Sequence, residues 1–97
     1  MKRIHFHPEA QAELNDAVAF YEARVLGLGI DLSKDVQAAT RKIQENPSRW
    51  QPFDKETRRF LIRRFPYSVI YLEGLDFITI VAVAHHKRGP GYWHGRI

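Results

Sequence analysis

A C-terminal run that begins at His85, HHKRGPGYWHGR, brings together residue types that can move protons and hold phosphates. RNA cleavage by attack of the 2′-hydroxyl needs a proton acceptor, positive charge at the crowded phosphate and a proton donor for the departing 5′-oxygen. His85 or His86 can supply acid or base near neutral pH. Arg88 can hold the phosphate, Tyr92 can donate a proton or stack, and Trp93 can stack a base. If the protein cleaves RNA, the run predicts a catalytic set of His85, Arg88 and Tyr92.

The same run also has a structural interpretation. Aromatic residues near a terminus commonly fasten a tail onto a sheet, so Tyr92 and Trp93 would pack while the charges stay exposed. Metal binding is a weaker hypothesis, because adjacent strand residues such as His85 and His86 point to opposite faces and no carboxylates follow at ligand spacing. Which histidine would face a substrate depends on a strand register that the sequence leaves open. No metal and no cofactor are predicted.

Four arginines flank an apolar centre in the segment TRRFLIRRF, residues 57–65. If the whole segment is a strand, Arg59 and Arg63 project from one face, and Arg58 and Arg64 project from the other. Such arginines can bind phosphates bidentately or pair with the carboxylates of an acidic partner. The alternative is a solvated edge strand whose charges prevent aggregation. The residues predicted to bind a nucleic acid or another target are Arg59, Arg63, Arg64, Lys87 and Trp93.

The positive charge is concentrated in the second half of the chain. Residues 1–40 carry four Lys and Arg against six Asp and Glu, a net charge of −2, whereas residues 41–97 carry eleven against five, a net charge of +6. The basic half predicts an anionic partner, either a phosphate backbone or an acidic protein segment. The alternative is that these residues only keep the surface soluble.

Length and composition predict one globular domain over residues 1–97. The chain has 97 residues, 44% hydrophobic and 12% aromatic, which suits a single packed core. It contains no cysteine, which excludes a disulfide framework, a thiol nucleophile and a thiolate metal site. No signal peptide and no apolar run near the roughly 18 residues of a membrane span appear, so a cytoplasmic protein without membrane contact is expected.

The first half of the chain predicts a short strand and two helices. Residues 2–7 alternate in character and predict a strand, and Pro8 suits the first turn of a helix. The segment 27–29, Gly-Leu-Gly, breaks that helix, and Pro47 ends the second. Apolar residues recur at three- and four-residue steps in both helices. The first set is Ala10, Leu14, Ala17, Val18, Tyr21 and Val25, and the second is Leu32, Val36, Ala39 and Ile43.

The second half predicts three strands, rich in β-branched and aromatic residues, at 57–65, 67–73 and 77–85. Pro66 and the segment 74–76 separate them, and such short gaps require antiparallel hairpins. The predicted fold class is therefore α+β, in the order strand–helix–helix–strand–strand–strand. A twisted, mainly antiparallel sheet should carry the helical hairpin on one face.

Taken in order, four stretches resemble the RelE/ParE family of toxins from type II toxin–antitoxin systems, which includes plasmid-stabilisation toxins. The stretches are FHPEAQAELNDAVAFYE, GLGIDLSKDVQAATRKIQENP, RRFLIRRFPYSVIYLE and FITIVAVAHHKRGPGYWHGR, and they cover nearly the whole chain. The resemblance implies a growth-inhibiting toxin that a cognate antitoxin neutralises with an acidic segment. It also implies one of two targets, since RelE-like members cut mRNA on the ribosome and ParE-like members poison DNA gyrase.

The match to the RNA-cleaving branch is partial. The resemblance relates Arg59, Arg63, Arg64, Arg88 and Tyr92 to basic and aromatic residues of RelE-like enzymes. Those enzymes usually carry an arginine after an aromatic residue in the central strand, where this chain has Ser68 after Tyr67. The FPYSVIY stretch and the His85 ending look closer to ParE. Inhibition of gyrase is therefore the preferred function. The alternatives are a ribosome-dependent mRNA endoribonuclease and a binding module that has lost its toxicity.

Overall fold

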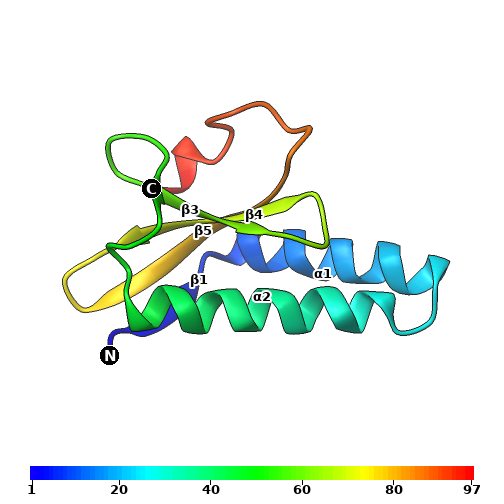
Figure 1. Cartoon of the computed structure of the whole chain (residues 1–97). Coiled ribbons are helices and arrows are strands. Elements are labelled where there is room, and N and C mark those ends of the chain that lie inside the picture. The colour runs from blue at the N-terminus through cyan, green and yellow to red at the C-terminus, as the bar shows by residue number, and fades with distance from the viewer.

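A hairpin of two helices covers one face of a five-stranded sheet (Figure 1). The computed structural model describes all 97 residues. The strands are β1 (Arg3–Phe6), β2 (Gln51–Pro52), β3 (Arg58–Ile62), β4 (Tyr67–Glu73) and β5 (Phe77–His85). The helices are α1 (Pro8–Arg24), α2 (Leu28–Glu45) and the short 3₁₀ helix η1 (His94–Arg96). None of these helices has the length and apolar character that a membrane crossing requires.

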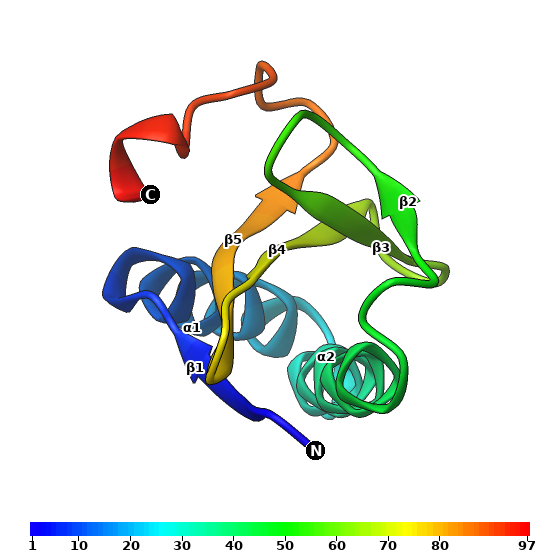
Figure 2. The same ribbon diagram turned by 90° about the vertical axis from the view of Figure 1, so that its left-hand side faces the viewer.

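The sheet order is β1-β5-β4-β3-β2, with the C-terminal segment lying over the face opposite the helices (Figure 2). The pairs β2–β3, β3–β4 and β4–β5 are antiparallel, whereas β1 joins β5 in parallel. This arrangement confirms the predicted α+β class and the mainly antiparallel sheet. The limits of β4 and β5 agree with the predicted strands at 67–73 and 77–85.

Helix α2 buries the stripe that its apolar spacing predicts, whereas α1 fully buries only half of its predicted set. In α1 the buried residues are Ala10, Leu14 and Ala17, and in α2 they include Leu32, Val36, Ala39 and Ile43. Val18 and Tyr21 are only partly buried, and Val25 lies beyond the end of α1 and is exposed. Together with residues of β3, β4 and β5, these side chains other than Val25 form the main core between helices and sheet. That burial removes apolar surface from water and holds the hairpin to the sheet.

The turn between the helices is tight because two glycines permit it. Gly27 has a φ of 88°, in the left-handed region that favours glycine. Gly29 is buried in the first turn of α2, and a Cβ there would lie 2.3 Å from the carbonyl oxygen of Val18. The predicted break at 27–29 therefore exists, but α2 already begins at Leu28, and at Gly29 the backbones of the two helices approach too closely to leave room for a side chain.

Glu22 of α1 caps the first turn of α2. Its carboxylate accepts hydrogen bonds from the N–H groups of Gly27 at 2.7 Å, Gly29 at 2.9 Å and Ile30 at 3.3 Å. These groups have no partner within the helix, and a negative charge beside them is favourable. The hydrogen bond from Gly27 is the largest cause that lowers the pKa of Glu22 below its ordinary value of 4.5.

Replacement of Glu22 with glutamine is expected to flatten the acid side of the stability profile. A carboxyl group whose folded pKa is lowered stabilises the fold above its unfolded pKa, and that contribution is lost as the pH falls through the folded pKa. The wild type should therefore exceed E22Q in free energy of unfolding at pH 6, and the difference should shrink toward pH 3. Urea denaturation of both proteins at several pH values measures this difference in the free energy of unfolding. Asp16→Asn, an exposed α1 control, should leave the profile unchanged, and an equal response from both variants would contradict the assigned cap.

Two parts of the sheet differ from the prediction. The strand predicted at 57–65 ends at Ile62, because the chain turns through residues 63–66 before Tyr67. Strand β2 was not predicted at all. It has only two residues, one of them Pro52, so it shows neither alternation nor β-branched composition.

Candidate functional site

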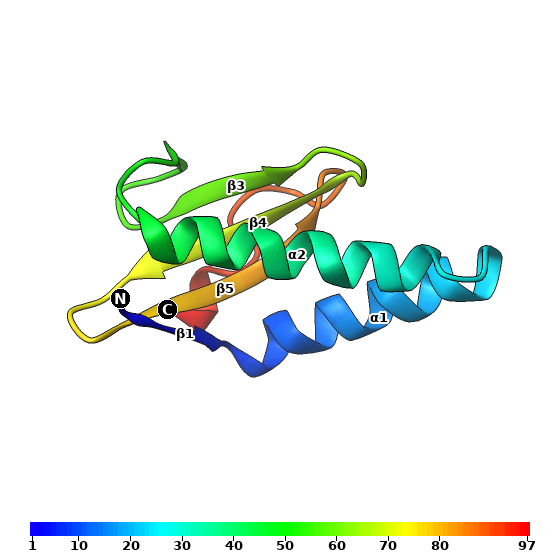
Figure 3. The same cartoon turned by 60° about the horizontal axis from the view of Figure 1, so that its bottom comes forward.

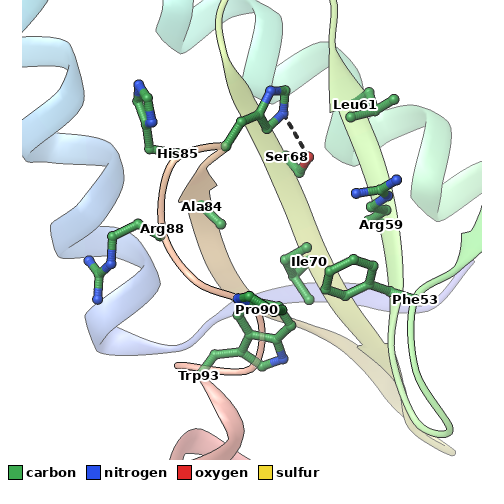
Figure 4. Close-up of a pocket in the computed structure, with 11 residues that line it drawn as sticks. Phe53, Arg59, Leu61, Ser68, Ile70, Ala84, His85, Arg88, Pro90 and Trp93 are labelled. Carbon is green, nitrogen blue, oxygen red and sulfur yellow. Dashed lines mark hydrogen bonds between the residues drawn. The ribbon is translucent and has the colours of Figure 1, made fainter.

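A pocket of about 250 Å³ opens on the sheet face that the helices leave uncovered (Figure 4). Ser68 and Ile70 of β4 and Ala84 of β5 line it, with Phe53, Arg59 and Leu61 on one side and His85, His86, Arg88, Pro90 and Trp93 on the other. The pocket thus collects residues from three strands and the C-terminal segment. Most of the residues singled out in the sequence lie in or beside it.

A β-bulge in β5 decides how the two histidines are placed. Ile70 pairs with Ala82 and Tyr71 pairs with Ile80, so Val81 is an extra residue opposite β4. After the bulge the alternation changes phase. Val83 consequently packs in the helix-side core, and Ala84 faces the pocket side of the sheet.

His85 and His86 have different neighbours as a result. The His85 ring packs edge-on against Tyr67, with ring centroids 5.0 Å apart. The His86 Nε2 atom lies 3.0 Å from the Ser68 hydroxyl oxygen, and its backbone N–H donates to the Pro66 carbonyl at 2.8 Å. Ser68 is 3% exposed, so this bond satisfies a buried hydroxyl group at the position where RelE-like enzymes carry a charge.

The C-terminal segment is fastened to α1 through Glu13. The Glu13 carboxylate accepts hydrogen bonds from the Tyr92 hydroxyl at 2.7 Å and from both terminal nitrogens of Arg96 at 3.0 and 3.1 Å. It also accepts the N–H of Val83 at 3.0 Å, and Arg96 donates to the Val81 carbonyl at 3.0 Å. Strand β1 ends at Phe6 and pairs only with the first part of β5. Beyond that part, Glu13 and Arg96 lie beside β5 and form the hydrogen bonds that a neighbouring strand would otherwise form with Val83 and Val81.

These contacts have clear electrostatic consequences. Burial raises the pKa of Tyr92 well above its usual range, and the hydrogen bond to Glu13 raises it further. The same carboxylate raises the pKa of Arg96. The Tyr92 proton is therefore held in a hydrogen bond that points away from the pocket toward α1. Glu13 itself was not singled out from the sequence, since its role depends on contacts with residues about 70 or more positions away.

Trp93 is 2% exposed and packs with Ile70, Val81, Ala82 and Ala84. Phe53 stacks on it at 5.3 Å between ring centroids. In this arrangement the indole is covered, so it is not available to stack a base. The burial agrees with the alternative in which the aromatic pair fastens the tail.

A second contact holds the tail to the loop after β2. His94 lies 3.0 Å from the Asp54 carboxylate, and Asp54 also accepts the Thr57 hydroxyl at 2.7 Å. The hydrogen bond from His94, followed by that from Thr57, holds the pKa of Asp54 well below its usual range. This pair was also not predicted, because nothing in the local sequence links positions 40 residues apart.

The predicted arginines separate into different environments. Arg59 stacks over Phe53 at 4.9 Å and donates to Gln51 at 3.3 Å. Since β3 ends at Ile62, Arg63 and Arg64 lie in a turn, and the expected sharing of a strand face by Arg59 and Arg63 is wrong. Arg64 forms a bidentate pair with Asp35 of α2 at 3.0 Å, whereas Arg63 is exposed and forms no ion pair.

One end of the sheet carries the exposed cationic side chains of Arg63, Lys87 and Arg88. The turn 63–66 and the segment after β5 meet there through the His86–Pro66 hydrogen bond. Lys87 and Arg88 are exposed, and the Arg88 guanidinium stacks over the Tyr92 ring at 3.8 Å. We call Arg63, His86, Lys87 and Arg88 the basic end of the sheet.

The three residues predicted to catalyse RNA cleavage lie near one another, but each functional group has its own partner. His85 contacts Tyr67, Arg88 covers the ring of Tyr92, and the Tyr92 hydroxyl binds Glu13. Nowhere in the chain do three or more histidine, cysteine, aspartate or glutamate side chains lie close enough together to hold a metal ion.

Comparison with known proteins gives consistent results. Residues 4–90 match the family described as the ParE toxin of type II toxin–antitoxin system, parDE. Toxin ParE2 from two strains of Mycobacterium tuberculosis, H37Rv and CDC 1551 / Oshkosh, is 28% identical over 90 residues, which cover 92% of this chain and 86% of the relative. The chromosomal ParDE TA system from P. aeruginosa contains a chain with a TM-score of 0.66 and 19% identity, over 88% of this chain and 96% of that chain. At that identity the structural likeness supports the fold.

Proposed function

Because the chain belongs to the ParE toxin family of type II toxin–antitoxin systems, we propose that it inhibits DNA gyrase by a protein–protein contact and that a cognate antitoxin neutralises it. Such a contact needs a docking surface and no reacting groups. The family match spans residues 4–90, which include both long helices and all of the sheet except Arg3 of β1.

The engagement of Tyr92 is the observation that favours gyrase over mRNA. A general acid must reach the leaving oxygen of its substrate within hydrogen-bond distance. The Tyr92 hydroxyl instead donates to Glu13, and its raised pKa makes release of the proton unfavourable. Ser68, bound to His86, adds no positive charge to the pocket.

The basic end of the sheet is the surface that suits a large acidic partner. The side chains of Arg63, Lys87 and Arg88 project from two adjacent loops at one end of the sheet, and Arg63 and Lys87 form no ion pair within the chain. Uncompensated charge of this kind speeds association with an oppositely charged surface and orients it.

Pulse-labelling of DNA and protein synthesis just after induction of the toxin alone tests the proposal. We expect DNA synthesis to fall first. If protein synthesis stops first, the ribosome becomes the target, and His85, Arg88 and Tyr92 become the residues to replace. That second function is favoured by the pocket, which is lined by Arg59, His86 and Arg88 together. Growth without inhibition would indicate a module that has lost its toxicity.

A charge reversal at the basic end should weaken the toxin. The double variant Arg63→Glu, Lys87→Glu is expected to raise the toxin concentration needed for half-maximal inhibition of gyrase supercoiling at least about tenfold, or roughly 1.4 kcal/mol. The matched control, Lys34→Glu with Arg41→Glu, makes the same change in net charge on exposed positions of α2. It should inhibit like the wild type. Equal loss in both variants would show that net charge matters and that the basic end does not.

A further inference from the structure

The turn between the two long helices exposes several large apolar side chains. Figure 3 shows this turn lying beyond the ends of the strands. Phe20 of α1, Ile30 of α2 and the two residues Val25 and Leu26 between the helices are all exposed. Single exposed apolar residues are common, but a group of large ones at the end of a projecting hairpin marks an interaction site. We call these four residues the hairpin tip.

Next to the tip, the exposed face of α1 carries small side chains. Ala12, Ala19 and Ala23 recur at seven- and four-residue steps, so they share one side of α1, away from the stripe that packs on the sheet. Alanine on such a face lets a second helix approach closely, because the distance between packed helix axes depends on the side chains at the contact. By contrast, exposed positions of α2 such as Lys34 and Arg41 are charged. Helix α1 thus has a partly apolar face that nothing in the chain covers.

Two charged residues of opposite sign flank Phe20 on α1. Asp16 precedes it by four residues and Arg24 follows it by four, so the three side chains lie along one side of the helix, about one turn apart. Neither Asp16 nor Arg24 forms an ion pair within the chain. The Arg24 guanidinium instead stacks over the Phe20 ring, 3.8 Å from its centroid. Because one free charge of each sign lies here, an acidic partner has less to gain at this surface than at the basic end of the sheet.

This pattern of side chains is complementary to itself. In a dimer with two-fold symmetry the same surface of both copies forms the interface, so two α1 helices that pack on each other run antiparallel. If the axis passes beside Phe20, the two Phe20 rings pack together, and Asp16 of each copy faces Arg24 of the other. Symmetry then creates two identical ion pairs around an apolar centre. Val25 and Leu26 would extend toward the start of the second copy's α1.

We propose that the chain self-associates into a two-fold dimer through the hairpin tip and the exposed face of α1, with Phe20 at the axis. One helix face and one turn supply less area than the roughly 800 Å² per partner of a standard stable interface. The dimer is therefore weak, and its population depends on the toxin concentration. The inference does not depend on the target of the toxin, because the partner is a second copy of the same chain.

Cysteine cross-linking tests the position of the axis, because the chain has no cysteine of its own. A residue beside a two-fold axis meets its own copy across the interface, so the Phe20→Cys variant should form a disulfide-linked dimer under mild oxidation. Phe77→Cys is the matched control, since Phe77 is 47% exposed and Phe20 48% exposed, but Phe77 lies at the start of β5, at the opposite end of the molecule (Figure 1). Phe20→Cys should cross-link at least about tenfold faster than Phe77→Cys. Equal rates in the two variants, or no cross-link in either, would overturn the proposal.

Sedimentation equilibrium with a charge exchange tests the ion pairs. The wild type should shift from monomer toward dimer as its concentration rises to about 1 mM. Asp16→Arg and Arg24→Glu each make both symmetric pairs repulsive, so each should raise the dissociation constant of the dimer at least about tenfold. The double variant restores opposite charges and should dimerise within about threefold of the wild type.

Three results would overturn the proposed dimer. The first is a wild type that stays monomeric at the highest concentration. The second is a folded double variant that dimerises no better than the single variants, since the antiparallel pairing would then be wrong. The third is a monomeric wild type whose folded Phe20→Ala variant no longer inhibits gyrase or no longer binds the antitoxin, because another partner would then occupy the hairpin tip.

Discussion

Replacement of Glu13 with alanine is expected to lower the free energy of unfolding by roughly 3 kcal/mol, as loss of one member of a buried ion pair does. The Arg96 side chain is 10% exposed and the Glu13 side chain 16% exposed, so neither charge is well solvated in the folded state. The substitution leaves the Arg96 guanidinium, the Tyr92 hydroxyl and the Val83 N–H without their shared acceptor. We expect the segment after residue 86 to detach from the sheet while the helices and strands remain.

Urea denaturation measures this loss, and in a Trp50→Phe background the fluorescence of the buried Trp93 reports the detachment of the tail. Glu9→Ala is the matched control, because it removes the same side chain from the same helix and Glu9 also lies near Arg96, at 3.5 Å. The Glu9 side chain is 65% exposed, so its removal should cost less than about 0.5 kcal/mol. Similar losses for the two variants would contradict the role assigned to Glu13.

Replacement of Gly29 with valine is expected to separate the helical hairpin and to cost about 3 kcal/mol of unfolding free energy. A Cβ at this position would lie 2.3 Å from the Val18 carbonyl oxygen and 2.9 Å from the Glu22 Cβ. The first of these atoms belongs to the backbone of α1, so relief of the clash requires the helices to move apart. That movement would also pull Glu22 away from the N–H groups that it caps.

Thermal and urea denaturation of G29V measure the cost. Gly95→Val is the control, since nothing lies within 4 Å of a Cβ built there and its φ is not in the left-handed region. It should change the melting temperature by no more than a few degrees. A G29V protein as stable as the wild type would show that the close approach of the helices is not needed.

The sequence predicted those elements whose cause is local. Alternation and β-branched residues define β4 and β5, so their limits agree with the prediction at 67–73 and 77–85. The four-, three- and four-residue spacing from Leu32 to Ile43 likewise predicted the buried face of α2. In each case a residue and its close neighbours carry the information, and period and composition suffice.

Features that depend on distant contacts were not predictable in the same way. The two residues of β2 form a strand only because Arg58 and Arg59 pair with them. The bulge at Val81 changes the phase of β5, which simple alternation does not reveal. It is this bulge that leaves His85 beside Tyr67 and His86 beside Ser68.

The candidate site shows the same division. The sequence placed positive charge at Arg63 and Lys87, and both are exposed at the basic end of the sheet. It left open whether Tyr92 catalyses and Trp93 stacks a base, or whether both fasten the tail, and their contacts with Glu13 and the sheet favour fastening. The sequence around Glu13 does not indicate its role. The polar positions of an amphipathic helix cannot be told apart from the sequence, and only the contacts with the tail distinguish Glu13 from the others.

Addition of the purified toxin to DNA gyrase with relaxed plasmid and ATP is the decisive test of the proposed inhibition. We expect the toxin to block supercoiling, and we expect the folded Tyr92→Phe variant, which keeps the ring but not the hydroxyl, to inhibit gyrase as well. Full supercoiling at a large excess of folded toxin, together with mRNA cleavage on ribosomes that Tyr92→Phe abolishes, would contradict the proposed inhibition.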